Sequence, residues 1–140
     1  MLASGSVTQI RISDAARFLG VSDDTVRRWV DQGVLDATRD DAGRKVVDGH
    51  ALAVLARERA EQVPDPSGVA SSARNRLVGL VTSIRKDAVM AQVELQCGPF
   101  RVVSLMSSEA VDDLGLEPGS VAVAVVKSTT VIVETAGRPA

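Results

Sequence analysis

Aromatic side chains, cysteine and histidine are all scarce in this chain. Its 140 residues include one Trp, two Phe and no Tyr, with a single cysteine, Cys97, and a single histidine, His50. The core must therefore be built from aliphatic side chains and alanine. One cysteine cannot form an internal disulfide framework, and a transition-metal cation site usually takes three or four ligands from His and Cys. These shortages argue against a disulfide scaffold, a zinc-type site and a Ser-His-Asp hydrolase.

Long apolar runs and an excess of one charge are also missing. No apolar stretch reaches the ~18 residues that a transmembrane helix needs. The opening residues 1–6 lack the basic start and apolar run of a signal peptide, so we expect a cytoplasmic protein with no membrane contact. Residues 1–63 carry 9 basic and 10 acidic side chains, and residues 64–140 carry 7 and 8. Any binding of DNA must therefore depend on local charge rather than on bulk charge.

The chain shows one clear break in composition. The segment Gln62–Ser71 holds two prolines and several small residues, which interrupt regular structure. Apolar residues recur with a helical period before it and with a period of two after it, as at Val89, Ala91, Val93 and Leu95. We predict an α+β protein of two domains: a helical domain over residues 8–62, a linker over residues 63–71 and a β-rich domain over residues 72–136.

Two short helices are expected near the start of the chain. Ser13 is expected to cap a helix that begins at Asp14, and Gly20 to end it. Ser22 is expected to cap a second helix, which Gly33 ends. Helices joined by such a turn are the sequence form of a helix-turn-helix. The residues expected to face the core are Ala15, Ala16, Leu19, Val26, Trp29 and Val30.

The stretch from Ile12 to Trp29, followed by Gly33-Val34-Leu35, Arg39 and Gly43-Arg44, resembles the MerR- and excisionase-type winged helix-turn-helix family. The resemblance implies a hairpin wing over residues 37–47 with its tip at residues 40–43. It also implies a third helix, capped by Asp48, that runs to about Glu61. In that family the second helix enters the major groove and the wing touches the DNA backbone. Double-stranded DNA is therefore an expected partner.

Candidate DNA contacts lie on the second helix and on the wing. Arginine can bond guanine with two hydrogen bonds, and threonine can meet a thymine methyl group. An alternative reading makes Asp23–Arg27 and Asp24–Arg28 ordinary surface pairs, four residues apart, with no role in binding. A dimer would offset the acidic neighbours by doubling the contacts. The candidates are Thr25 and Arg28 for bases, and Arg27, Arg44 and Lys45 for phosphates.

The second half of the chain reads as a small barrel. Alternating, β-branched segments predict strands near residues 77–85, 89–97, 100–105, 121–126 and 131–134. A short helix over Ser107–Leu114 is expected before the turn at Gly115–Gly119. Five strands with one helix after the third are typical of an OB-like β-barrel. Cys97 is expected to act as a small hydrophobe, and His50 to be structural or solvated.

The opening Ser72-Ala73-Arg74-Asn75-Arg76-Leu77, with the later Val111–Leu116 and Val125–Thr129, resembles the Mop domain, also called the molybdate-binding TOBE domain. The resemblance spans nearly all of residues 72–135. It implies that the opening segment and the Lys127-Ser128 segment meet across a subunit contact. One such domain per chain therefore implies a homo-oligomer.

A tetrahedral dianion needs several N–H and O–H donors and one or two cations around it. The segments 72–75 and 127–128 offer these groups without any carboxylate. In two places the chain departs from the family: Asp87 and Met90 stand where glycine and asparagine are common, and Ala110 where a ligand serine is often found. The candidate ligands of molybdate or tungstate are Ser72, Arg74, Asn75, Ser107, Lys127 and Ser128.

These features favour a DNA-binding transcriptional regulator, not an enzyme, that responds to molybdate or tungstate. One alternative is an intracellular molybdate-binding storage or homeostasis protein without specific DNA binding. Another is a DNA-binding protein whose barrel only mediates assembly. A third is an accessory to a molybdenum-cofactor enzyme, for which the sequence shows no catalytic residues.

Overall fold

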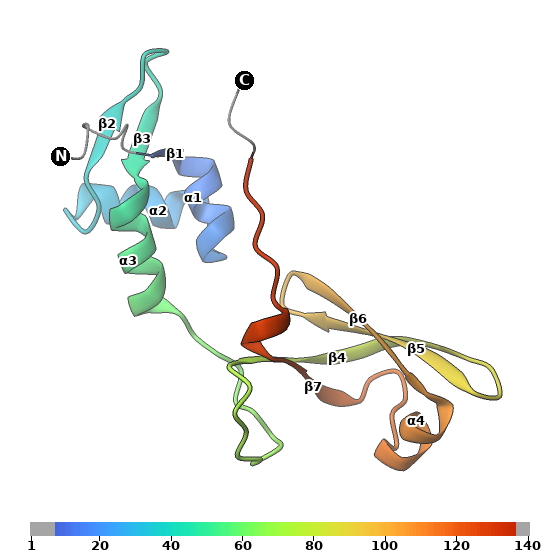
Figure 1. Cartoon of the computed structure of the whole chain (residues 1–140). Coiled ribbons are helices and arrows are strands. Elements are labelled where there is room, and N and C mark those ends of the chain that lie inside the picture. The colour runs from blue at the N-terminus through green and yellow to red at the C-terminus, as the bar shows by residue number, and fades with distance from the viewer. Residues whose placement is uncertain (1–7, 137–140) are drawn as a thin grey trace. The chain divides into compact units, whose positions relative to one another are not determined.

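The computed structural model describes residues 8–136 and divides between Gln62 and Val63 into two compact units, each with its own core (Figure 1). The first unit is mainly helical and the second is mainly a sheet. Within the described part of the chain, no helix is both long enough and apolar enough to cross a membrane.

The N-terminal unit combines three helices with a small antiparallel sheet of order β1-β3-β2. The helices pack on one another and against the sheet, and the strands β2 and β3 form a hairpin between the second and third helices (Figure 1). Its elements are β1 (Gln9–Arg11), α1 (Ile12–Leu19), α2 (Asp23–Asp31), β2 (Ala37–Arg39), β3 (Lys45–Asp48) and α3 (Gly49–Arg59).

The turn between α1 and α2 follows from local chemistry. Gly20 takes the left-handed conformation with φ of 68°, which glycine adopts without a steric penalty. The backbone N–H of Val21 then donates to the carbonyl of Ala16 at 3.0 Å. The Ser22 hydroxyl accepts a bond of 3.1 Å from the N–H of Thr25. The predicted cap at Ser22 is confirmed, as is the cap of α3, where Asp48 accepts from the N–H of Ala51 at 3.1 Å.

The predicted cap at Ser13 is wrong. Helix α1 begins at Ile12, and its N-cap, Arg11, makes no side-chain capping bond. The reason is the short strand β1, in which Ile10 pairs with Val47 and carries the chain directly into the helix. Helix α2 ends at Asp31, before Gly33, and α3 ends at Arg59 rather than near Glu61.

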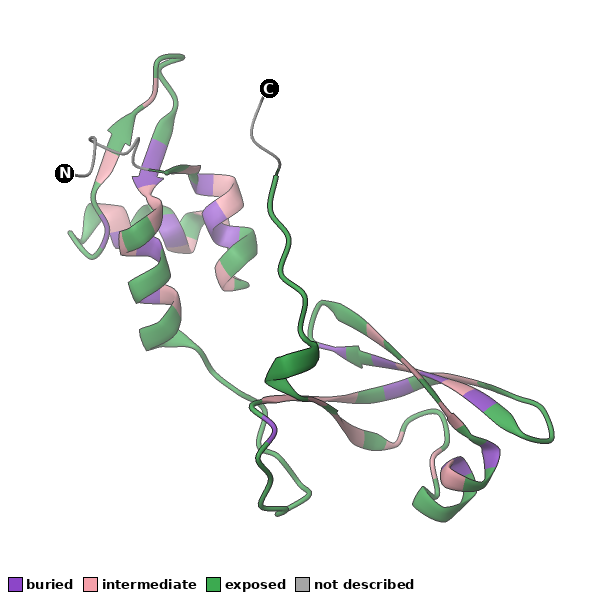
Figure 2. Cartoon of the chain, viewed as in Figure 1, coloured by how far each residue is buried: buried purple, intermediate pink, exposed green. Residues whose placement is uncertain are grey.

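The core of the N-terminal unit lies where α1, α2 and α3 meet the sheet. Ala15 and Val26 are fully buried, and Trp29 is 8% exposed. The Arg59 guanidinium lies 5.2 Å from the centre of the Trp29 ring, a distance at which a cation is attracted to an aromatic face. Figure 2 shows the buried residues of α1, α2 and α3 on the inner sides of these helices. Apart from Trp29, the buried core residues of this unit are aliphatic or alanine, as the shortage of aromatics predicted.

The C-terminal unit is one curled antiparallel sheet of order β6-β5-β4-β7, a half-barrel that carries a short helix (Figure 1). The long strand β4 lies between β5 and β7, and a bulge between Val81 and Ser83 marks its curl. Its elements are β4 (Asn75–Lys86), β5 (Met90–Cys97), β6 (Phe100–Ser107), α4 (Ser108–Leu114), β7 (Val121–Val126) and the 3-10 helix η1 (Ser128–Thr130).

The expected fifth strand at residues 131–134 does not form in this chain. A 3-10 turn at Ser128–Thr130 follows β7, and residues 131–136 pair with no strand of the described structure. The side chains of Ile132 and Val133 are 85% and 87% exposed. The predicted closed barrel is therefore a half-barrel of four strands, and β6 and β7 remain its two edges.

The open interior of the half-barrel is an apolar groove of about 830 Å³ between the two edge strands. Buried Val93 and Leu95 of β5 form its floor, and Leu116 follows α4 along one side. Val102 and Met106 of β6 and Ala122 and Ala124 of β7 also line it.

The close approach of β4 to β5 explains why residue 79 is a glycine. A Cβ atom at Gly79 would lie 2.5 Å from the carbonyl oxygen of Gln96 and 2.6 Å from the Cys97 sulfur. Real Cβ atoms do not approach other atoms so closely, so only glycine fits here. Cys97 is buried, as predicted for a small hydrophobe.

Candidate functional site

The β4–β7 pairing brings the two candidate anion-binding segments to one end of the sheet. Asn75 stands opposite Val126 in the ladder. The Asn75 side-chain amide also donates a bond of 3.2 Å to the Val126 carbonyl oxygen. The two segments, which the family resemblance placed across a subunit contact, therefore lie beside each other within one chain, because β4 pairs with β7. This pairing places Ser72, Arg74, Asn75, Lys127 and Ser128 at the same end.

The charged groups of this cluster are available to a ligand. Arg74, Lys127 and Ser128 are exposed, and neither Arg74 nor Lys127 forms an ion pair within residues 8–136. The backbone beneath Lys127 is ordered by η1, where the N–H and the hydroxyl of Thr130 both donate to the Lys127 carbonyl, at 2.9 and 2.8 Å. The result is two exposed cations and several hydroxyl and amide donors on a fixed backbone, which suits an anion.

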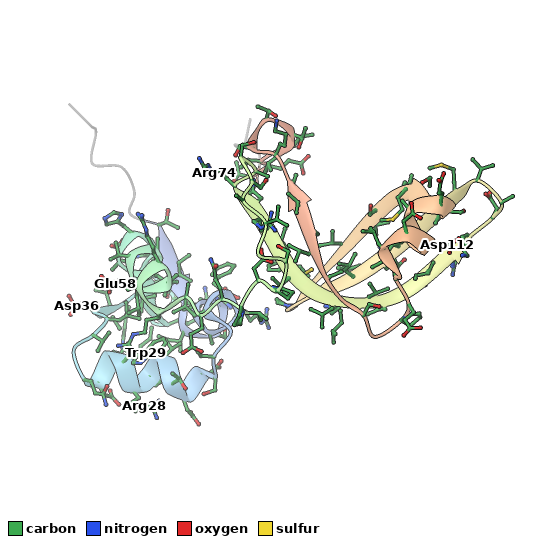
Figure 3. The ribbon with its side chains drawn as sticks, turned by 90° about the horizontal axis from the view of Figure 1, so that it is seen from below. Arg28, Trp29, Asp36, Glu58, Arg74 and Asp112 are labelled. Carbon is green, nitrogen blue, oxygen red and sulfur yellow. The ribbon has the colours of Figure 1, made fainter. Side chains whose placement is uncertain are left out.

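Ser107, the sixth candidate, lies elsewhere. It ends β6 opposite Met90, whereas Asn75 begins β4 at the far end of the sheet. The Ser107 hydroxyl accepts a bond of 3.0 Å from the N–H of Ala110 and caps α4. Figure 3 shows Arg74 and the α4 residue Asp112 at opposite ends of this unit. One chain therefore does not bring Ser107 to the other five candidates.

The loop beside Ser107 carries the aspartate at which the chain departs from the Mop pattern. The Asp87 carboxylate accepts bonds of 2.8 Å from the N–H groups of both Met90 and Val89. These bonds hold the pKa of Asp87 below its ordinary value, and the bond from Met90 has the larger effect. The buried Ser108 hydroxyl donates to the Asp87 carbonyl at 2.7 Å. The Asp87 carboxylate is thus engaged by the backbone of its own loop, and Lys86 beside it pairs with Asp112 at 2.8 Å.

A cluster that the sequence did not reveal joins β4 to the preceding segment. The Arg76 Nε donates to an Asp65 carboxylate oxygen at 2.7 Å, and its Nη2 donates to the Ser67 hydroxyl at 2.8 Å. The other Asp65 oxygen accepts from the N–H of Ser67 at 2.8 Å. Arg76, followed by Ser67, lowers the pKa of Asp65 to about 2. The Asp-Pro-Ser-Gly order signals a turn here, but not its arginine partner.

On α2 the candidate DNA contacts differ in availability. Arg27 forms an ion pair of 3.2 Å with Asp24, while Arg28 has no ion-pair partner among the described residues. The alternative pairs Asp23–Arg27 and Asp24–Arg28 are therefore not formed. Figure 3 shows Arg28 on the outer side of α2, away from Trp29. The Thr25 hydroxyl lies 2.9 Å from that of Ser22.

The tip of the hairpin is built around one aspartate. Asp40 accepts from the N–H groups of Ala42 and Arg44, each at 2.9 Å, and pairs with the Arg44 guanidinium at 3.2 Å. The bond from the backbone of Arg44 is the largest cause that lowers the pKa of Asp40. Arg39 donates to the Gly43 carbonyl at 2.6 Å. Lys45 is exposed and forms no ion pair in the part of the chain that is described.

Two families match the two units. Residues 10–60 match a helix-turn-helix domain, and residues 71–133 match the TOBE domain. Fold and sequence thus define a chain that joins a helix-turn-helix domain to a TOBE domain. Through its C-terminal unit the chain belongs to the TOBE family that includes the Mop molybdenum-pterin-binding proteins.

Individual relatives cover this same unit. Molybdenum-pterin-binding protein 3 of Clostridium pasteurianum is 41% identical over 63 residues, which are 44% of this chain and 93% of that protein. The structure of a molybdate-binding protein from Sporomusa ovata is 33% identical and covers 48% of this chain and 100% of its own, with a TM-score of 0.46. The structure of the cytoplasmic molybdate-binding protein ModG with molybdate bound is 45% identical and covers 46% of each chain, with a TM-score of 0.43.

Proposed function

We propose that this protein is a cytoplasmic DNA-binding transcriptional regulator that responds to molybdate or tungstate and catalyses no reaction. The observation that carries the proposal is the meeting of residues 72–75 with residues 127–128, which the bond from Asn75 to Val126 fixes. The relatives described as molybdate-binding proteins support the choice of ligand. The match to a helix-turn-helix domain supports the choice of DNA.

The proposed anion ligands have two chemical roles. Arg74 and Lys127 supply positive charge, and Ser72, Asn75 and Ser128 supply directional donors. Charge-assisted hydrogen bonds of this kind are roughly twice as strong as neutral ones. Molybdate and tungstate are tetrahedral dianions and can accept from all of these groups at once.

The proposed DNA interface is α2 together with the β2–β3 hairpin, the arrangement of a MerR-like winged helix-turn-helix. Arg28 is the leading base contact because it has no ion-pair partner among the described residues. Thr25 is the second base contact. Arg27, Arg44 and Lys45 are proposed for phosphates, where Arg27 and Arg44 must exchange their aspartate partners for the DNA backbone.

We propose a homo-oligomer in which a second copy closes the half-barrel. The groove lies between two unpaired edge strands, β6 and β7, and an added strand there would satisfy both edges. Residues 131–134 have the alternation of a strand, and Ile132 and Val133 are largely exposed. Insertion of this segment from a second copy would bury both side chains. Assembly would also allow Ser107 of one copy to approach the anion-binding cluster of another.

In an oligomer, anion binding can change the affinity for DNA. Paired helix-turn-helix units must match half-sites about one helical turn apart. An anion held between subunits would favour one arrangement of those units over another. This control requires that the two arrangements bind the anion with unequal affinity.

The experiment is a binding-site selection from a randomised DNA pool with the full chain, followed by fluorescence anisotropy on the selected duplex. We expect a specific duplex whose affinity changes several-fold with molybdate and not with equimolar sulfate. A selected duplex whose affinity ignores molybdate would contradict the regulator, as would the absence of any selected sequence.

A molybdate storage or homeostasis protein is the second candidate. Its support is that aspartates neutralise two of the proposed DNA-binding arginines: Asp24 pairs with Arg27, and Asp40 pairs with Arg44. This candidate predicts molybdate binding by the full chain without a selected DNA sequence. Isothermal titration with molybdate, run beside the DNA selection, therefore distinguishes it from the regulator.

A further inference from the structure

Residues 65–71, expected to form a free linker, are attached to the C-terminal unit. Their anchor is Arg76, which donates to the Asp65 carboxylate at 2.7 Å and to the Ser67 hydroxyl at 2.8 Å. The ion pair joins residues 11 positions apart. We call residues 65–71 the strap.

The strap also holds its own shape. Asp65 accepts from the N–H of Ser67, and the Ser67 hydroxyl accepts from the N–H of Val69 at 3.4 Å. Gly68 has φ of 62°, a conformation that glycine takes freely. At the end of the strap, the Ser71 hydroxyl accepts from the N–H of Ala73 at 3.1 Å, and Ala73 is buried. Side chains thus order this segment where no helix or strand does.

The anchor is partly shielded from water. The side chains of Arg76 and Asp65 are 22% and 33% exposed, less than those of the other ion pairs that involve arginine on α1 and α2. Partial burial weakens the screening that makes fully exposed pairs ineffective. Arg76 also donates through two different nitrogens, which fixes its orientation as well as its charge.

The strap forms part of the groove wall. Pro66, Val69 and Ser71 line the groove together with residues of β6 and β7 such as Val102 and Ala124. Any segment that enters the groove therefore meets the strap as well as the edge strands.

We call the bonds from Arg76 to Asp65 and Ser67 the clasp. We propose that the clasp holds the strap as one wall of the groove, and that it thereby couples occupation of the groove to the segment that leads into the helix-turn-helix unit. It rests on the proposed self-association, in which residues 131–134 of a second copy occupy the groove. With the strap held at Asp65, the free connection runs only from Ala60 to Pro64, because α3 ends at Arg59. Five residues span at most roughly 17 Å. The clasp thus limits how far each DNA-binding unit can move from an assembled core.

Coupling of this kind is reciprocal. If the clasp lowers the free energy of self-association by some amount, self-association stabilises the clasped strap by the same amount. Loss of the clasp should therefore both loosen the strap and weaken the oligomer.

The test is hydrogen–deuterium exchange of the full-length protein with Asp65→Asn and Arg76→Gln. Asp65→Asn keeps an acceptor for the N–H of Ser67 and removes the charge that Arg76 binds. We expect the backbone amides of residues 67–73 to exchange about two- to fivefold faster in either variant, the range of a single ion pair, and no faster in the double variant. The matched control is Asp87→Asn, because Asp87 also accepts from the backbone N–H two residues later but has no arginine partner among the described residues. Strap amides that exchange as fast as those of residues 60–63 in the unaltered protein would overturn the clasp.

Sedimentation equilibrium on the same proteins tests the coupling. We expect Asp65→Asn and Arg76→Gln to raise the dissociation constant of self-association by a similar factor, and Asp87→Asn to leave it unchanged. A loosened strap with unchanged self-association would overturn the coupling. An unaltered protein that stays monomeric would overturn the proposed assembly and the coupling together, while the exchange measurement still decides whether the clasp exists.

Discussion

The Asn75 side chain reaches across 51 residues of sequence to donate a hydrogen bond of 3.2 Å to the carbonyl oxygen of Val126. This bond fastens the first residue of β4 to the last residue of β7. Arg74 and Lys127 are the next residues outward on the two strands, so the bond sets where the two cations lie. The candidate anion site is thus a consequence of strand register as much as of residue type.

Asn75→Asp should damage the anion site more than Asn75→Ala does. The alanine variant loses the bond to Val126, worth about 1 kcal/mol of folding free energy, and one proposed donor to the anion. The aspartate variant also places a carboxylate between Arg74 and Lys127, so we expect molybdate affinity to fall at least about tenfold further, or ~1.4 kcal/mol. Isothermal titration of both variants measures the difference, and equal affinities would contradict the placement of the site.

Gly79→Ala should destabilise the C-terminal unit. A new Cβ would meet the Gln96 carbonyl at 2.5 Å and the Cys97 sulfur at 2.6 Å, and both neighbours are held within β5. Overpacking of this kind costs about 1–3 kcal/mol, which urea unfolding followed by circular dichroism will measure. Thr82→Ala, on the same strand at an exposed position, is the control and should change stability much less.

Arg28→Ala should weaken specific DNA binding more than Arg27→Ala does. Arg28 has no ion-pair partner in residues 8–136 and lies on the outer side of α2, whereas Asp24 holds Arg27 at 3.2 Å. A lost base contact costs about 1–3 kcal/mol and relaxes sequence preference at one position. Loss of a phosphate contact instead lowers the salt dependence of binding. Anisotropy on matched and mismatched duplexes separates the two effects, and the reverse ranking would refute the assignment.

Local signals in the sequence predicted much of the fold. Ser22 and Asp48 were identifiable as helix caps because a cap needs only one side chain and the three residues after it. The strand β1 and the start of α1 at Ile12 were not predictable, since three residues show no period and their strand is defined by pairing with distant β3. The alternation at residues 131–134 predicted a strand, but a strand must also pair with an edge. In the described structure the turn at Ser128–Thr130 follows β7, and residues 131–134 pair with neither of the edge strands β6 and β7.

In the candidate site, too, the features set by local sequence were predictable and those set by distant contacts were not. The residue types of segments 72–75 and 127–128 indicated an anion, and the β4–β7 pairing joins them. The position of Ser107 at the opposite end of the sheet depends on the lengths of three strands and could not be read from its neighbours. The clasp between Asp65 and Arg76 is a contact between side chains across a turn, and composition alone marked that segment as a flexible linker.

The Asp65 carboxyl should titrate well below its ordinary pKa. Arg76 and Ser67 lower its pKa from 3.8 to about 2, so folding favours the charged form. The stability that it contributes is present in full above pH 3.8 and is lost as the pH falls through about 2. Carbon-detected NMR of the side-chain carboxyl measures the midpoint. Arg76→Gln should move that midpoint toward 3.8, and a midpoint near 3.8 in the unaltered protein would show that the clasp is not formed in solution.

Ile132→Asp should disrupt self-association. The proposed assembly buries Ile132 in the groove of a second copy, and an unpaired carboxylate is costly to bury there. Light scattering coupled to size-exclusion chromatography should show a smaller species than the unaltered protein. Val89→Asp is a control at another exposed apolar position of the same unit, 69% exposed. If Ile132→Asp and the unaltered protein share one oligomeric state, the second copy does not enter the groove through this segment.

The end of the sheet shared by Arg74 and Lys127 is proposed to bind a tetrahedral oxyanion. The most direct measurement is isothermal titration of the full-length protein with molybdate, with sulfate as the control ligand, repeated on Lys127→Ala. Lys45→Ala removes the same charge from the other unit and serves as the control variant. We predict selective molybdate binding that Lys127→Ala abolishes and Lys45→Ala retains. A folded protein that binds no molybdate, or one that binds it equally well without Lys127, would contradict the account.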